Sequence, residues 1–193
     1  KGSTKTKAVL HARSLIDGKC RSIEPPQPIA GTLIHFDIET DPLCGTSAEE
    51  TYLWGFLVPP HGREDYEYIW HDGGPDEDCR AWHEFLEYVA ELRNRFERPR
   101  LVHYARYERD VISRNARIRG DLNHPTIEWL LNDGGLFDLR ETVVRSLIVP
   151  TKGYGLKDIC KMPELINFQW ELQESGSQWS VVRFHDFLNS DSE

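Results

Sequence analysis

The residues best suited to chemistry are two acids inside an apolar segment, L-I-H-F-D-I-E-T-D-P at residues 33–42. Such a segment is typical of a strand, and successive side chains of a strand point to opposite faces. Asp37 and Glu39 therefore share one face, about 7 Å apart. Two ionised carboxylates this close repel each other, and a divalent cation such as Mg²⁺ or Mn²⁺ removes the repulsion. The stretch predicts either part of a metal site or a strand end with hydrated acids.

Two further acids follow apolar segments. Glu108 lies in the first turns of a predicted helix at 107–117, beside a buried stripe that contains Tyr107 and Val111. It is either directed at the same cleft as the acidic pair or a favourable charge at the helix N-terminus. Asp138 follows the pair Leu-Phe and precedes another helix, so it is either an N-cap or an acid of the same cleft.

Strand and helix patterns account for most of the chain after Thr32. Aromatic and β-branched runs with short polar connections favour antiparallel strands. Further along the chain, apolar residues recur three or four positions apart, as in a helix with one buried face. Strands are predicted at 32–39, 51–58, 66–71 and 100–104, helices at 82–96, 107–117, 126–133, 139–147, 156–160 and 180–188, and a strand or turn at 135–139. This order predicts an α/β domain with a mixed β-sheet flanked by helices. Core positions are predicted for Trp54, Trp70, Trp82, Trp129 and Trp170, rather than roles in stacking bases.

Residues 1–31 read as a linker or extension from an upstream region, with a short helix near 8–16 and a proline-rich stretch, and 32–193 as the folded domain. The net charge of −9 argues against binding nucleic acid by bulk electrostatics but is compatible with a carboxylate site that binds cations. The four cysteines have no paired spacing, and no apolar run is long enough to span a membrane. These features predict a cytoplasmic protein.

Three segments, H-F-D-I-E-T-D, H-Y-A-R-Y-E-R-D and F-D-L-R-E-T-V-V-R-S, resemble in this order the motifs of the DnaQ-like, or DEDD, exonuclease branch of the ribonuclease H-like superfamily. Y-G-L-K-D-I-C is similar to a segment of one subgroup, the RNase H-like domain that accompanies RecB-type nuclease modules in predicted bacterial nucleases. The resemblance covers about residues 30 to 188 and implies a ribonuclease H-like fold.

The resemblance also implies roles for the acids. Asp37 would bridge two Mg²⁺ or Mn²⁺ ions, and Glu39 would hold the ion that activates water. Glu108 would hold the other ion or orient a metal-bound water, and Asp138 matches a further acid of the family. The implied contacts with phosphate or a terminal nucleotide fall on Tyr104, Tyr154 and Lys157. For Tyr154 and Lys157, the alternative is local packing and a solvated lysine.

The activity implied is hydrolysis of DNA, or of RNA, from a single-stranded 3′ end, with DNA repair as the setting and an adjacent RecB-type nuclease or helicase domain as a partner. One departure affects this expectation. The family closes its site with an Asp in a helix that reads roughly Tyr-Asn-x-x-Asp, whereas this sequence ends soon after S-V-V-R-F-H-D-F-L, and Asp186 and Asp191 are poor substitutes. We therefore expect a domain truncated at its C-terminus, and the alternative function is an inactive module that binds nucleic acid or a partner.

Overall fold

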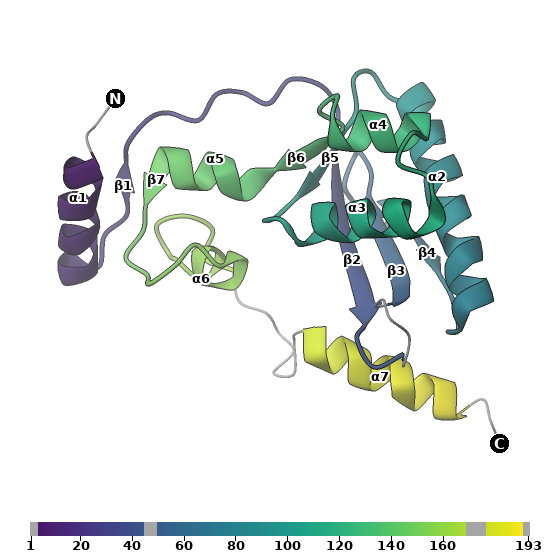
Figure 1. Cartoon of the computed structure of the whole chain (residues 1–193). Coiled ribbons are helices and arrows are strands. Elements are labelled where there is room, and N and C mark those ends of the chain that lie inside the picture. The colour runs from purple at the N-terminus through teal and green to yellow at the C-terminus, as the bar shows by residue number, and fades with distance from the viewer. Residues whose placement is uncertain (1–3, 45–49, 169–176, 191–193) are drawn as a thin grey trace. The chain divides into compact units, whose positions relative to one another are not determined.

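The chain forms two compact units in the computed structural model, which describes residues 4–44, 50–168 and 177–190 (Figure 1). One unit holds the described residues of 1–29 and 138–173, and the other holds those of 30–137 and 174–193. The linker at 1–31 and the single folded domain at 32–193 stay predictions. The inclusion of 138–173 with the N-terminal residues was not predicted, because it depends on contacts between segments far apart in the sequence.

The larger unit is built on a mixed sheet with the strand order β4-β3-β2-β5-β6. The strands are β2 (Leu33–Asp41), β3 (Glu50–Leu57), β4 (Tyr66–Trp70), β5 (Arg100–His103) and β6 (Leu136–Asp138). β2 pairs antiparallel with β3 and parallel with β5, and β3 pairs antiparallel with β4. The predicted mixed sheet is therefore confirmed, and the segment near 135–139 forms a short strand.

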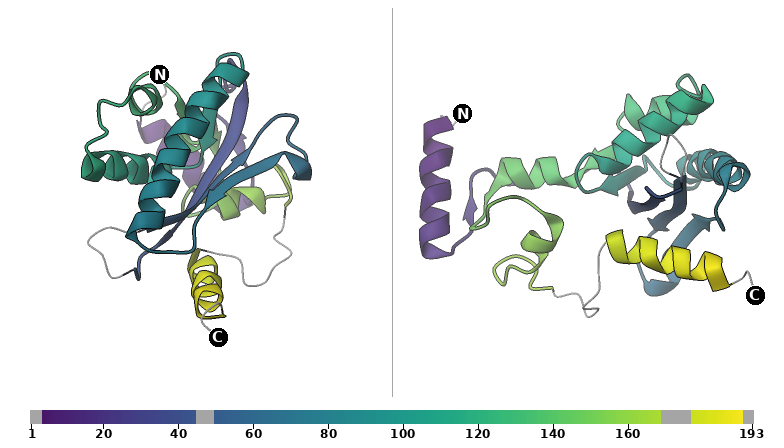
Figure 2. Two further views of the ribbon diagram at one scale, coloured as in Figure 1. Left: turned by 90° about the vertical axis from the view of Figure 1, so that its right-hand side faces the viewer. Right: turned by 60° about the horizontal axis from the view of Figure 1, so that its bottom comes forward.

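Helices flank this sheet, as the views of Figure 2 show. They are α2 (Pro75–Arg95), α3 (Tyr107–Arg119), α4 (Pro125–Leu131) and α7 (Ser177–Ser190), with a short 3₁₀ turn at Arg63–Asp65. α2 begins earlier than its apolar spacing predicts, because Pro75 at its first position and three acids in its first turn favour a helix start there. α3 ends where Gly120 adopts a left-handed conformation (φ 80°).

The core of this unit lies between the sheet and helices α2, α3 and α4. Apolar residues of β2 and β3 alternate toward it, and the helices contribute residues three or four positions apart. Phe85 of α2 is fully buried and its ring contacts four others, those of Phe36, Trp54, Phe56 and Trp82. The aromatic cluster therefore joins the central strands to α2.

The tryptophan predictions have different outcomes. Trp54 and Trp82 are buried and Trp129 packs against the core, as predicted. The prediction for Trp70 is wrong: it is 37 % exposed and contacts the rings of Phe184 and Phe187 in α7. In β4, Ile69 points to the core, so strand alternation turns its neighbour Trp70 to the other face. Trp170 lies outside the described residues.

The smaller unit contains α1 (Thr4–Asp17), β1 (Arg21–Ser22), α5 (Leu139–Ser146), β7 (Leu147–Ile148) and α6 (Leu156–Cys160). β1 pairs antiparallel with β7, and Val149, Ile159 and Met162 form a separate small core. The predicted N-terminal helix is confirmed as α1, whereas a link to an upstream region stays a prediction. No helix in the described ranges is long and apolar enough to cross a membrane.

We expect Phe85→Ala to lower the free energy of unfolding by about 3–5 kcal/mol, because it removes a fully buried ring and leaves a cavity. Urea unfolding followed by circular dichroism and by the total tryptophan fluorescence measures this. Ile118→Ala on α3, where the side chain is 59 % exposed, is the control and should change stability by less than about 0.5 kcal/mol. Equal effects of the two substitutions would show that the core is wrongly placed.

Candidate functional site

Strand β2 separates the core from a polar face of the sheet. Ile34, Phe36 and Ile38 are buried, while Asp37 is exposed and Glu39 is half-buried. The predicted placement of the two acids on one face is therefore confirmed. The interpretation as a strand end in solvent does not describe Glu39, because protein atoms cover much of its side chain.

Helix α7 packs against β2 beside this face, and it lies across the end of the strand in Figure 1. The Ser180 hydroxyl forms a hydrogen bond with the Glu39 carboxylate, and its oxygen lies 2.6 Å from the hydroxyl oxygen of Tyr52. The ring of Tyr52 stacks on Phe184 at 4.1 Å between centroids, and His185 Nε2 lies 3.1 Å from Asp41 Oδ2. Glu39 is thus held by a helix more than one hundred residues away in the sequence.

Glu108 comes from the first turn of α3 and is buried. Its Oε2 lies 3.2 Å from Nδ1 of His103, the last residue of β5. The link between them contains Ala105 with a φ of 76°, a left-handed turn that brings the start of the helix back to the strand end. Asp110 instead points to solvent near Arg106. Of the two acids in this turn, Glu108 is the one held close to the sheet.

One detail of the α3 prediction is wrong. The buried stripe consists of Glu108, Val111, Ile112, Asn115 and Ala116, whereas Tyr107 is 46 % exposed and its hydroxyl contacts the Thr40 hydroxyl. Glu108 therefore lies within the stripe rather than beside it. The contact of Tyr107 with β2 fixes the N-terminal end of α3 to the strand that carries the acidic pair.

The three carboxylates affect one another through their charges. Desolvation raises the pKa of Asp37, and the charge of Glu108 raises it further. Desolvation and the charge of Asp37 raise the pKa of Glu39 to about 7, although the Ser180 hydrogen bond acts in the opposite direction. Asp37 stays accessible to solvent, yet neighbouring protein replaces enough water to disfavour its ionised form. Carboxylate oxygens that repel one another in this way suit a divalent cation, whose positive charge offsets the repulsion.

The carboxylates do not converge on a point. In the part of the chain that the structure describes, no three His, Cys, Asp or Glu side chains are placed to hold a metal ion. The contacts of Glu108 with His103 and of Glu39 with Ser180 account for this, since each directs an acid toward a protein group. Binding a cation between them requires these side chains to rotate.

The other predicted residues are placed as follows. Asp138 caps α5, with Oδ1 accepting a hydrogen bond from the Arg140 N–H at 2.9 Å, and it begins the segment assigned to the smaller unit. Tyr154 donates a hydrogen bond to the Leu147 carbonyl and packs on the small core, which agrees with local packing. Tyr104 is half-buried in the larger unit, and Lys157 is exposed on α6. Their predicted roles in binding stay predictions.

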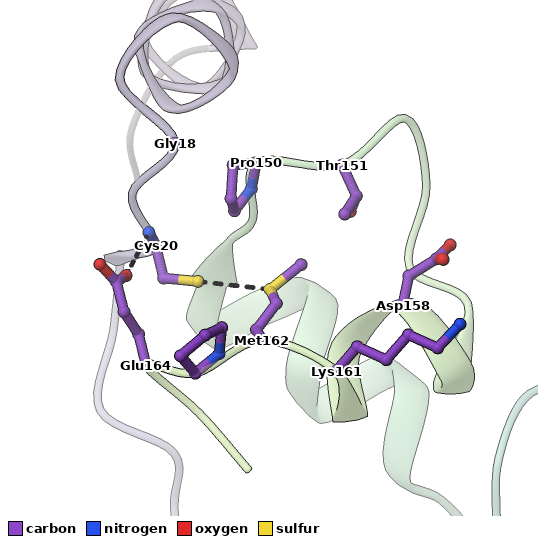
Figure 3. A pocket seen from close by; sticks show the side chains of 9 residues that line it. Gly18, Cys20, Pro150, Thr151, Asp158, Lys161, Met162 and Glu164 are labelled. Carbon is purple, nitrogen blue, oxygen red and sulfur yellow. Dashed lines mark hydrogen bonds between the residues drawn. The ribbon is translucent and has the colours of Figure 1, made fainter. Parts of the chain in front are cut away.

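A pocket of about 420 Å³ lies in the smaller unit and was not predicted. Figure 3 shows Cys20 directed toward Met162, with 3.5 Å between the sulfur atoms, while Glu164 Oε2 accepts a hydrogen bond from the Cys20 N–H. Burial is the main reason that the pKa of Cys20 is raised, so its thiol stays protonated. Tyr154 and Lys157 are not among the residues that line this pocket. No sequence pattern indicates it, because its walls come from distant segments.

Comparison with known proteins gives one match. A family model described as the RNase_H superfamily matches residues 34–193. No curated protein and no solved structure matches the chain. The matched range starts within β2 and contains Asp37, Glu39 and Glu108.

We expect the stability effect of Glu39→Gln to depend on pH in metal-free buffer. Because the folded-state pKa is raised from 4.5 to about 7, the folded protein loses stability as pH rises through this window, and the ionised form is the costly one. Glutamine removes that cost, so the variant should be more stable than the wild type by about 1–2 kcal/mol at pH 8, after allowance for solvent screening, and similar to it near pH 4.5.

Chemical denaturation in EDTA at the two pH values checks this. Glu87→Gln, at an exposed glutamate of α2, is the matched control and should have little effect at either pH. A Glu39→Gln effect of the same size at both pH values would contradict the assignment.

Proposed function

Because the chain belongs to the RNase H superfamily, we propose that it is a metal-dependent nuclease whose site is centred on Asp37, Glu39 and Glu108. Members of this superfamily are generally nucleases, and they typically use divalent metal ions. The observation that carries the proposal is the placement of Asp37 and Glu39 on one face of β2, where desolvation and neighbouring negative charge raise the pKa of each. Structural carboxylates without a ligand are normally placed where their ionised forms are favoured, so raised pKa values are typical of functional sites.

Each acid has its own role in the proposed site. Asp37 interacts through its charge with both Glu39 and Glu108, which suits a ligand shared by two cations. A bound Mg²⁺ or Mn²⁺ would supply neutralisation of the phosphate charge and activation of water. Glu39, which accepts the Ser180 hydrogen bond, and Glu108, which contacts His103, would each rotate toward a bound cation. Asp138 is a candidate for a further ligand.

In its finer form, the proposal is a 3′-5′ exonuclease of the DnaQ-like, or DEDD, branch that hydrolyses phosphodiester bonds of DNA or RNA. The support is the order of the three motifs and the position of Glu108 at the start of α3 after β5. The same proposal includes a single-stranded 3′ end as the substrate, bound in part by Tyr104, Tyr154 and Lys157. It also includes an adjacent RecB-type nuclease or helicase domain as partner, a role in DNA repair and a cytoplasmic location.

A second candidate function is a catalytically inactive module that binds nucleic acid or a partner. The specific observation in its favour is that Glu108 and Glu39 are engaged by His103 and Ser180, and that no described group of three potential ligands is placed to hold an ion. The two candidates differ in whether the acids bind cations, which can be measured directly.

We expect Asp37→Asn to lower the rate at which the protein cuts a labelled single-stranded oligonucleotide in Mn²⁺ by about 100-fold or more. The reason is that loss of a metal ligand removes several kcal/mol of transition-state stabilisation. Mn²⁺ should also raise the unfolding temperature of the wild type at pH 8, and raise it less in the variant.

Asp110→Asn is the matched control, because Asp110 is an exposed acid on the same helix turn as Glu108. It should leave both the rate and the effect of Mn²⁺ unchanged. If the wild type and Asp37→Asn are equally inert and Mn²⁺ stabilises neither, the nuclease proposal is wrong and the inactive module is favoured.

A further inference from the structure

Strand β4 exposes aromatic side chains on the face of the sheet that carries the acids. Tyr66 is 46 % exposed and Tyr68 is 61 % exposed. Ile69, the next residue after Tyr68, points to the other face and packs against the core. Their ring centroids are 6.0 Å apart and the ring planes differ by 27°. Exposed aromatic side chains side by side at the edge of a sheet have no role in the core described above.

Strand register places this pair beside the acids. Gly55 of β3 pairs with Asp37 on one side and with Tyr68 on the other, so the three residues form one row across the sheet on the same face. Adjacent strands lie about 4.8 Å apart, which puts the Cα atoms of Tyr68 and Asp37 about 10 Å apart. The exposed ring is therefore within the length of one or two nucleotides of the carboxylate.

The missing side chain at Gly55 is what lets Tyr66 extend toward Asp37. A Cβ atom at Gly55 would lie 2.3 Å from the Tyr66 hydroxyl oxygen, so this hydroxyl occupies the space that a side chain at position 55 would fill. Desolvation, followed by the charges of Asp37 and Glu39, raises the pKa of Tyr66. Its hydroxyl thus lies over Gly55, on the face of the sheet that carries the acids.

Trp70 marks where this surface ends. Its ring meets the rings of Phe184 and Phe187 edge-on, at 6.4 and 5.0 Å between centroids, so helix α7 occupies that end of β4. Tyr66 and Tyr68 lie beyond this contact and keep their exposed areas.

We propose that Tyr66 and Tyr68 form a stacking platform for the terminal bases of a single-stranded nucleic acid whose phosphate reaches Asp37. The inference rests on the proposed nuclease function and adds to it the residues that position the substrate and the preference for unpaired bases. Bases in a duplex are already stacked on their neighbours, so only an unpaired end can place a base on these rings.

Nucleic acid bases are the occupant that fits this surface. The chain has a net charge of −9, and the neighbouring acids repel phosphates, so the bulk charge of the protein does not attract a strand to this surface. Stacking on aromatic rings is independent of charge and tolerates any base, which suits an enzyme that degrades strands of any sequence. The continuity of the rings with the acids, through one row of paired residues, places base and phosphate at adjacent points.

We expect Tyr68→Ala to weaken binding of a short 5′-labelled oligothymidine in Ca²⁺ by between about fivefold and 100-fold, measured by fluorescence anisotropy. Tyr66→Ala should have an effect in the same range. Tyr68→Phe keeps the ring and should bind as the wild type does. Gly55→Ala displaces the Tyr66 ring without removing it and should weaken binding in the same direction as Tyr66→Ala.

An oligonucleotide with abasic positions at its 3′ end separates stacking from a structural effect. It should bind the wild type weakly, and Tyr68→Ala should not weaken it further, because the partner of the ring is already absent. A ribose version of the same oligonucleotide compares RNA with DNA. The platform is disproved if both alanine variants bind the normal oligonucleotide as the wild type does, if the abasic oligonucleotide binds equally well, or if no oligonucleotide binds and the surface serves a protein partner.

The test is separate from that of the nuclease proposal. Cutting that depends on Asp37, together with binding that is indifferent to the tyrosines, disproves the platform alone. Base-dependent binding that requires Tyr68, without cutting or stabilisation by Mn²⁺, disproves the nuclease and retains the platform.

Discussion

The pleat of β2 is the constraint on which the rest of the site depends. Its period of two directs Ile34, Phe36 and Ile38 into the core and turns Asp37 and Glu39 to the opposite face. A slip of one residue would bury both carboxylates among aromatic rings, at a cost of several kcal/mol for each ion. The apolar residues therefore determine where the acids lie, and the aromatic contacts of the core hold the chemistry of the opposite face in register.

Neighbouring groups then set the state of each acid. Ser180 restrains Glu39, His103 restrains Glu108, and Asp37 lies between their charges. The result is a group of acids in which desolvation and mutual repulsion raise the pKa values of Asp37 and Glu39, so that the fully ionised state is disfavoured.

Much of this could be predicted from local patterns. The alternation around Asp37 and the helical spacing around Glu108 are properties of short segments, and both are confirmed by the structure. Prediction from the sequence failed for features that depend on contacts between distant segments. The core position predicted for Trp70 is wrong, because strand alternation and the contact with α7 decide its environment. Nothing in the local sequence identifies Ser180 as the partner of Glu39, or indicates that the N-terminal residues fold with 138–173.

The register shift between Glu39 and Thr40 leaves Tyr52 as an extra residue of β3, without a partner on β2. The ring of Tyr52 therefore does not point into the core as those of Trp54 and Phe56 do, but stacks on Phe184 of α7. The contact between Tyr52 and α7 therefore depends on the extra residue in β3 as well as on the aromatic side chain at position 52. Loss of Tyr52 would make the ladder regular, with Thr51 still opposite Thr40 and Glu50 still opposite Asp41, but it would remove the ring that stacks on Phe184 and the hydroxyl that lies beside Ser180.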